Sequence, residues 1–188
     1  LWWILKQLYD KKLLYKGYTI QPYSPAAGTG LSSHELNLPG CYKDVKDTSI
    51  VAQFNVTRDA KSEFLFKQPK GEVFILAWTT TPWTLPSNTA LAVGEQVKYV
   101  QVNSYNQYTH KPVSIVLAKD LVSKYFSEKN KELKLEDFKA GDKNIPFEIV
   151  QEFTGKGLIG IRYEQLMPYL QPFYDADKAF QVITGDFV

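Results

Sequence analysis

The pattern of apolar and polar positions predicts a mainly β domain. Val73 to Trp78 is continuously apolar with β-branched and aromatic members, and its length suits a strand covered on both faces. Ile50 to Val56 alternates between apolar and polar residues, as Val97 to Val102 does. Pro112 to Ala118 predicts a further strand. These patterns predict an α+β fold that is mainly β, with mostly antiparallel strands.

A few peripheral elements accompany these strands. Apolar positions from Trp2 to Tyr9 fall on one helical face, and Gly17 is the predicted end of that helix. Tyr18 to Tyr23 predicts a short strand, and Lys119 to Phe126 predicts a second helix. Phe147 to Arg162 has a strand pattern interrupted by glycines that permit bends or bulges.

Composition divides the chain near residue 43. Ser24 to Gly40 is rich in Gly, Ser and Pro and has no periodicity, which is typical of a connector. We therefore expect a helix and connector over residues 1–43 and a β domain over residues 44–188. Because the chain starts without Met and ends in the strand-like run Ala179 to Val188, it is expected to be a piece of a longer protein.

Composition also limits the possible functions. The 188 residues are 44% hydrophobic and 14% aromatic, enough for a sizeable core. A net charge of +2 does not by itself indicate nucleic-acid binding. The single cysteine, Cys41, excludes an internal disulfide and a cysteine-only zinc site. Without a membrane-length apolar run or a recognisable signal peptide, the sequence predicts a cytoplasmic protein with no membrane partner.

Polar residues gather where the central apolar run ends. Thr79, Thr80 and Thr81 follow that run, and Pro82 suits the first position of a helical turn that Thr81 would cap. Pro86 is expected to limit this turn to about one winding. Converging polar groups at a strand end suit a small-molecule site. On composition alone, however, a threonine triplet beside proline is more often structural.

Other possible sites are weakly supported. Gly28-Thr29-Gly30 lacks the lysine and the following helix pattern of a phosphate-binding loop. His34 and His110 have no second histidine, cysteine or acid at ligand spacing, so no metal site is predicted.

The run TTTPWTLPSN, residues 79–88, resembles the threonine-rich signature of the editing domain inserted in isoleucyl-tRNA synthetases, a family of class I enzymes. Related valyl and leucyl enzymes carry an arginine where Thr81 stands. The runs KGYTIQPYSPAAGTGLSSHELN and GKGLIGIRYEQL, residues 16–37 and 155–166, are similar to the entry and a later part of the same region. The resemblance covers nearly the whole chain. It implies a barrel-like editing domain of the valyl/leucyl/isoleucyl type with a few peripheral helices.

The resemblance also implies an activity. An apolar pocket rejects a side chain one methylene smaller only weakly, so these enzymes correct the error at a second site. That site hydrolyses valyl-tRNA for isoleucine or valyl-adenylate. By resemblance, Thr79 to Thr81 would hold the valyl ester and its attacking water, and Asn88 would bind the terminal adenosine or orient the water. Thr84 and Trp83 would contact the substrate, although a core position for Trp83 is an equal alternative.

Partners and cofactors follow from the same resemblance. The tRNA acceptor end, mischarged valine and the remainder of the synthetase are the implied partners. The whole enzyme would use ATP and Mg, but the HIGH and KMSKS motifs are absent from these 188 residues, so no cofactor is expected here. The family's substrate-binding aspartate and its histidine would follow Val188, so the isolated chain is expected to be inactive. A valyl or leucyl homologue and a non-catalytic β-barrel module that binds RNA or protein remain alternatives.

Overall fold

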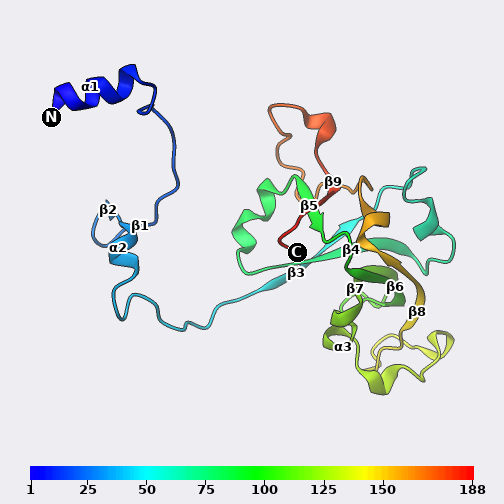
Figure 1. Ribbon diagram of the computed structural model, residues 1–188. Coiled ribbons are helices and arrows are strands. Elements are labelled where there is room, and N and C mark those ends of the chain that lie inside the picture. Colours follow the sequence, from blue (N-terminus) through cyan, green and yellow to red (C-terminus); the bar gives the residue numbers. More distant parts are fainter. The chain divides into compact units, whose positions relative to one another are not determined.

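The computed structural model describes residues 1–188, which form two units, Leu1–Lys46 and Asp47–Val188 (Figure 1). The first unit contains four short elements. They are α1 (Trp2–Asp10), β1 (Tyr23–Ser24), β2 (Thr29–Gly30) and α2 (Ser33–Leu36). No residue of α1 or α2 is buried.

Two predictions for the first unit are wrong. The first helix ends at Asp10 rather than at Gly17, because the chain turns at Lys12, whose φ is 59°. The strand predicted over Tyr18 to Tyr23 does not form, since only Tyr23 and the residue after it find a partner, in β2. An apolar pattern without a partner strand does not make a sheet.

A five-stranded sheet forms the centre of the second unit. Its strand order is β3-β4-β7-β6-β8, and only the β4–β7 pair is parallel. The strands are β3 (Ile50–Asn55), β4 (Glu72–Thr79), β6 (Lys98–Tyr105), β7 (Pro112–Ala118) and β8 (Glu148–Thr154). A separate parallel pair is formed by β5 (Ala90–Val93) and β9 (Gln181–Thr184). The mainly β prediction is confirmed, and the five-stranded sheet itself is open, with β3 and β8 at its edges.

Short helical segments connect these strands. The predicted helix over 119–126 is confirmed as the 3₁₀-helix η3 (Lys119–Leu121) followed by α3 (Val122–Tyr125). The others are η1 (Glu63–Phe66), η2 (Pro82–Ser87), η4 (Glu128–Asn130), η5 (Leu135–Asp137), η6 (Gly155–Leu158) and η7 (Ala176–Lys178). None of the helices is long and apolar enough to cross a membrane.

The sheet has a hydrophobic cluster on each face, which fixes the orientation of β4. Val73 and Ile75 are buried in the larger cluster, and Phe74 and Leu76 pack against the smaller one. The predicted cover on both faces is therefore confirmed for most of the strand. This cover ends before Trp78, which is 56% exposed, so β4 leaves the core just before the threonine triplet.

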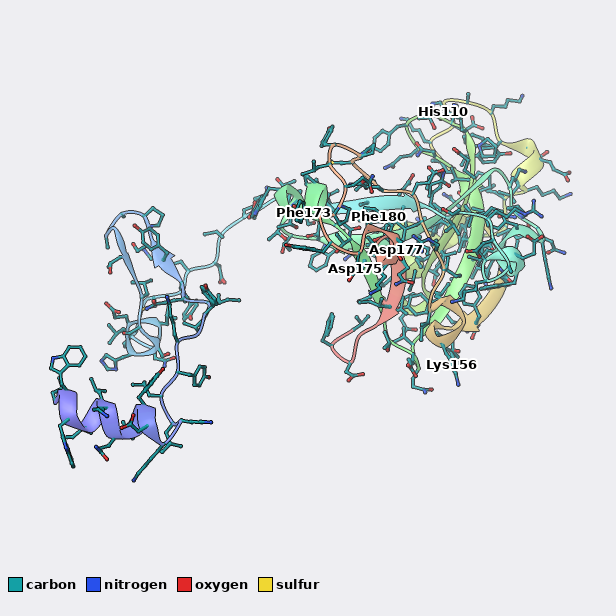
Figure 2. All side chains as sticks on the ribbon, turned by 90° about the horizontal axis from the view of Figure 1, so that it is seen from above. His110, Lys156, Phe173, Asp175, Asp177 and Phe180 are labelled. Atoms are coloured by element: carbon teal, nitrogen blue, oxygen red, sulfur yellow. The ribbon has the colours of Figure 1, made fainter.

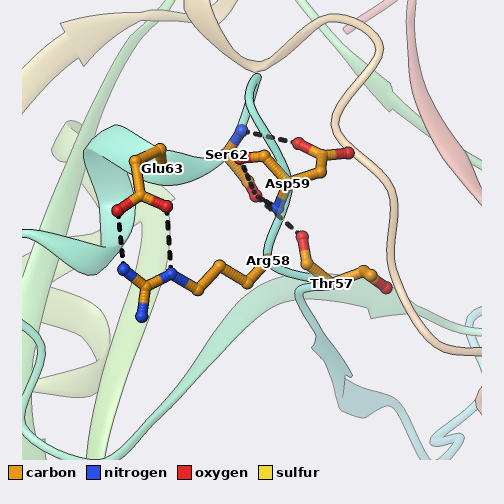
Figure 3. Close-up of polar contacts among 5 residues, drawn as sticks. All are labelled: Thr57, Arg58, Asp59, Ser62 and Glu63. Atoms are coloured by element: carbon orange, nitrogen blue, oxygen red, sulfur yellow. Dashed lines mark hydrogen bonds and ion pairs between the residues drawn. The ribbon is translucent and has the colours of Figure 1, made fainter.

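The connection from β3 to β4 is held by a compact polar turn (Figure 3). The hydroxyl of Ser62, which is fully buried, donates to the carbonyl of Thr57 at 2.7 Å and accepts from the backbone N–H of Asp59 at 2.8 Å. Arg58 and Glu63 form a bidentate ion pair at the surface. The backbone N–H of Ser62 donates to the Asp59 carboxylate, which holds the pKa of that carboxyl below its usual value.

Candidate functional site: the threonine turn

The segment Thr79–Asn88, called here the threonine turn, joins the end of β4 to the start of β5. Thr79 is the last residue of β4 and pairs with Ile50 of β3. The helix η2 follows and spans six residues with Pro86 inside it, so the prediction of about one winding is wrong. A 3₁₀-helix has three residues per turn, and the backbone bonds from Thr84 to Thr81 and from Asn88 to Leu85 follow that spacing.

Three hydroxyl groups of the turn lie together. Thr79 Oγ1 lies 3.2 Å from Thr81 Oγ1, which lies 3.4 Å from Thr84 Oγ1. The Thr84 hydroxyl donates to the carbonyl of Thr81 at 2.8 Å, and the backbone N–H of Thr81 donates to Thr79 Oγ1 at 3.0 Å. Thr81 occupies the cap position of η2, but its side chain accepts no bond from the helix backbone, so the predicted side-chain cap is wrong.

Only one arrangement of hydroxyl protons satisfies these contacts. The proton of Thr84 points to the Thr81 carbonyl, so Thr81 must donate to Thr84 and Thr79 must donate to Thr81. A hydroxyl has one proton and two acceptor lone pairs. All three protons are therefore used inside the turn, and each oxygen keeps one lone pair for an outside donor.

The structure does not bring Thr80 into this group. Thr80 is exposed in the bend between β4 and η2, and the hydroxyl bonds of the turn connect only Thr79, Thr81 and Thr84. The Thr80 hydroxyl consequently keeps its proton as well as both lone pairs. It is the one hydroxyl of the triplet that is free to donate.

Trp83 lies on the surface of the turn with 67% of its area exposed. A core tryptophan is buried on most of its surface, so the alternative that placed Trp83 in the core is wrong. Thr84 follows Trp83 in η2. An exposed aromatic face next to polar groups suits contact with a ligand.

Asn88 sits at the end of η2, and its amide is held on both sides. The hydroxyl of Tyr163 donates to Asn88 Oδ1 at 2.7 Å, and Asn88 Nδ2 donates to the carbonyl of Ala90 at 2.9 Å. Burial raises the pKa of the Tyr163 hydroxyl above its ordinary value, so this donor keeps its proton. Asn88 makes no hydrogen bond to a threonine hydroxyl, so the structure places it beside the hydroxyl group rather than within it.

The sequence analysis gave no role to two residues that support this region. Tyr163 is buried and contacts Asn88, and the Arg162 guanidinium donates to the carbonyls of Asp177 and Ala179 at 2.9 and 3.1 Å. Both residues lie in the run GKGLIGIRYEQL, whose likeness to the editing family was the only signal pointing to them.

The hydroxyl groups of the threonine turn have only neutral hydrogen-bond partners. Its hydroxyl bonds run to other hydroxyls and to the backbone, with no carboxylate, imidazole or amine among the partners. His110 lies well apart from Asp175 and Asp177 in the second unit (Figure 2). No cluster of three or more His, Cys, Asp or Glu side chains is arranged to hold a metal ion. The turn can therefore orient a molecule but supplies no titratable base.

Cavities of the second unit lie elsewhere. Three of them, of about 1020, 440 and 210 Å³, are lined by residues between 64 and 70, between 101 and 103, and between 131 and 151. The threonine turn lines none of the three. Since Thr80, Thr81 and Trp83 are exposed, the turn forms an open surface.

Comparison with known proteins decides the family. Residues 1–153 match the family model described as tRNA synthetases class I (I, L, M and V). The chain belongs to this family. It is 63% identical to isoleucine–tRNA ligase of Cytophaga hutchinsonii, 59% to that of Bacteroides fragilis and 53% to that of Porphyromonas gingivalis. Each match covers 100% of this chain and 16% of the relative, so the chain spans about one-sixth of these ligases. The resemblance to isoleucyl-tRNA synthetases is confirmed.

A solved structure supports the fold of this class I synthetase segment. The crystal structure of GlLeuRS-CP1 is similar with a TM-score of 0.50, and the match covers 75% of this chain and 48% of that chain. At 15% sequence identity this likeness concerns the fold alone. The predicted fold class, mainly β with a few peripheral helices, is confirmed, and the fold is similar to that of GlLeuRS-CP1.

Proposed function

We propose that the second unit is the editing domain of an isoleucyl-tRNA synthetase and that the threonine turn hydrolyses valine wrongly esterified to tRNA for isoleucine, or valyl-adenylate. The main observation behind this proposal is the group of three hydroxyls at the end of β4, within the run that resembles the editing signature. The 53–63% identity to isoleucine–tRNA ligases supports the choice of tRNA.

The proton arrangement of the turn supports a role for its hydroxyls in holding water. The outward-facing lone pairs of Thr79, Thr81 and Thr84 accept hydrogen bonds from a water molecule. The lone pairs of that water then point away from the turn. A water held in this way is aimed at an ester carbonyl carbon placed above the turn. The contribution is orientation, which accelerates a reaction by bringing the reacting atoms into line.

The remaining residues of the turn contact the ester and its nucleotide. The Thr80 hydroxyl, whose proton is free, donates to an oxygen of the ester or of the terminal ribose. Trp83 provides an exposed aromatic wall. Asn88 keeps one N–H and one carbonyl lone pair free, which suit the terminal adenosine or the water.

The whole ligase supplies what this segment does not. It brings the tRNA acceptor end and the mischarged valine to the turn, and it uses ATP and Mg to attach isoleucine to tRNA in the cytoplasm. The valyl ester carries an ammonium group, and a carboxylate binds such a group about twice as strongly as a neutral acceptor does. Since no carboxylate belongs to the hydrogen bonds of the turn, we expect the 188-residue chain alone to hydrolyse valyl-tRNA poorly.

The test uses a full-length isoleucine–tRNA ligase that carries this sequence. Thr80→Ala and Thr81→Val should each slow the deacylation of valyl-tRNA for isoleucine by at least about 10-fold, while isoleucine attachment stays unchanged. Thr89→Ala is the matched control, because Thr89 is exposed just beyond the turn and its backbone carbonyl, which the substitution keeps, accepts the hydrogen bond from Phe180. Deacylation at the wild-type rate in both turn variants would show that the threonines are structural.

A further inference from the structure

Tyr163 and Asn88 join two segments that are 75 positions apart in the sequence. Tyr163 is 3% exposed, whereas η2, which ends just before Asn88, has no buried residue. The hydroxyl bond of 2.7 Å therefore ties the surface helix to the core. Besides this bond, η2 contacts the core through the half-buried side chain of Leu85.

The ring of Tyr163 is fixed from several sides. It packs edge-on against Phe54 at 5.2 Å and against Phe180 at 6.2 Å between ring centroids. Its backbone N–H donates to the carbonyl of Phe180 at 3.0 Å, and it forms a bridge with Val56 beyond the end of β3. A ring held in this way presents its hydroxyl at one place only.

Asn88 links the fixed hydroxyl of Tyr163 to the threonine turn. Its backbone N–H donates to the carbonyl of Leu85 at 3.0 Å, and its amide nitrogen donates to the carbonyl of Ala90 at 2.9 Å. The end of η2 is thereby bonded to the backbone of Asn88 and the start of β5 to its side chain. The other end of η2 begins beside Thr81, whose hydroxyl belongs to the hydroxyl group of the turn.

We propose that Tyr163 is a positioning residue for the threonine turn, acting through Asn88. Its hydroxyl fixes which way the Asn88 amide faces, so that the free N–H and the free lone pair of Asn88 keep one orientation toward the nucleotide or the water. It also limits the movement of η2, which carries Trp83 and Thr84. This inference rests on the proposed hydrolysis at the same turn and adds a residue that does not touch the substrate.

The test removes the hydroxyl and keeps the ring. In the full-length ligase, Tyr163→Phe should lower kcat for deacylation of valyl-tRNA by about 10-fold and change KM by less than about 2-fold, because alignment is lost while the binding surface remains. Isoleucine attachment should stay unchanged. Tyr105→Phe is the matched control, since the Tyr105 hydroxyl donates to the carbonyl of Leu135 at 2.7 Å, away from the turn.

A second measurement does not depend on hydrolysis. Tyr163→Phe should speed hydrogen exchange in the peptide covering residues 81–89 by about 5-fold, the equivalent of one lost hydrogen bond, and Tyr105→Phe should leave that peptide unchanged. Equal deacylation kinetics in Tyr163→Phe and the wild type would overturn the positioning role, as would unchanged exchange. If the wild type itself does not deacylate valyl-tRNA, the proposed function fails, and the exchange experiment still decides whether Tyr163 holds the turn.

Discussion

The hydroxyl oxygens of Thr79 and Thr81 lie 3.2 Å apart, so the last residue of β4 and the residue before η2 share one polar surface. Between them, Thr80 is exposed, and the hydroxyl bonds of the turn do not include it. We therefore expect the two flanking threonines to act on a bound molecule together and the middle one to act separately.

This relationship predicts non-additive effects. Thr79→Val and Thr81→Val each remove a hydroxyl with little change in shape, and each should slow deacylation of valyl-tRNA in the full-length ligase. Because each variant already disrupts the same water position, the double variant should be only slightly slower than the slower single variant, with a coupling of about 1 kcal/mol. Thr80→Ala combined with Thr81→Val should be closer to additive. Multiplicative losses for the Thr79 and Thr81 pair, measured by single-turnover deacylation, would contradict the shared site.

Trp83 offers a separate test of the site. With 67% of its area exposed, Trp83→Ala should change the free energy of unfolding by less than about 0.5 kcal/mol. It should raise KM for valyl-tRNA, because the aromatic wall is lost. The control is Phe54→Ala, which removes a side chain that is 1% exposed and should cost about 3–5 kcal/mol. Urea denaturation measures the unfolding free energy of both variants. A large loss of stability in Trp83→Ala would mean that Trp83 has a structural role.

Ser62 is predicted to matter for stability and not for hydrolysis. Ser62→Ala removes the buried hydroxyl that bonds the carbonyl of Thr57 and the N–H of Asp59, two hydrogen bonds that contribute about 0.5–1.5 kcal/mol each, so it should cost about 1–3 kcal/mol of unfolding free energy (Figure 3). Ser123→Ala, at an exposed position of α3, should change stability by less than about 0.5 kcal/mol. Well below its unfolding temperature, Ser62→Ala should deacylate valyl-tRNA at the wild-type rate. A loss of activity without a loss of stability would mean that the polar turn between β3 and β4 belongs to the editing site.

Local pattern was enough to predict β4 and the polar cluster at its end. A continuous apolar run needs cover on both faces, and Val73 to Leu76 receive it from two separate clusters. The same reasoning failed for Tyr18 to Tyr23, where five of the six residues have no strand beside them. Whether a strand forms depends on a partner strand from another part of the chain, and the local pattern does not contain that information.

The local sequence pattern also could not predict which side chains of the threonine turn come together. Three consecutive threonines are equivalent in the sequence, yet the bend at residue 80 separates Thr80 from its neighbours. The bond between Tyr163 and Asn88 spans 75 positions and forms only because the core brings Tyr163 beneath the end of η2. Such contacts depend on the assembled core rather than on any short stretch of sequence.

The last prediction concerns stability at alkaline pH. Burial raises the pKa of Tyr163 above the ordinary value of 10.0 because the ionised form loses its hydration. The folded state then keeps the proton at a pH where the unfolded chain releases it. This contribution to stability is complete below about pH 10 and is lost as the pH rises from there through the folded-state pKa.

For the 188-residue chain, the unfolding free energy should therefore fall above about pH 10, with Tyr163 contributing at most about 1.4 kcal/mol per pH unit. In Tyr163→Phe this contribution is absent, so the slope should be smaller. A residual slope is expected in the variant, since burial also raises the pKa of Tyr99. Urea denaturation between pH 8 and about pH 11 measures both slopes. Identical slopes would mean that the Tyr163 hydroxyl is hydrated in the folded protein, which would also remove the fixed donor that holds Asn88.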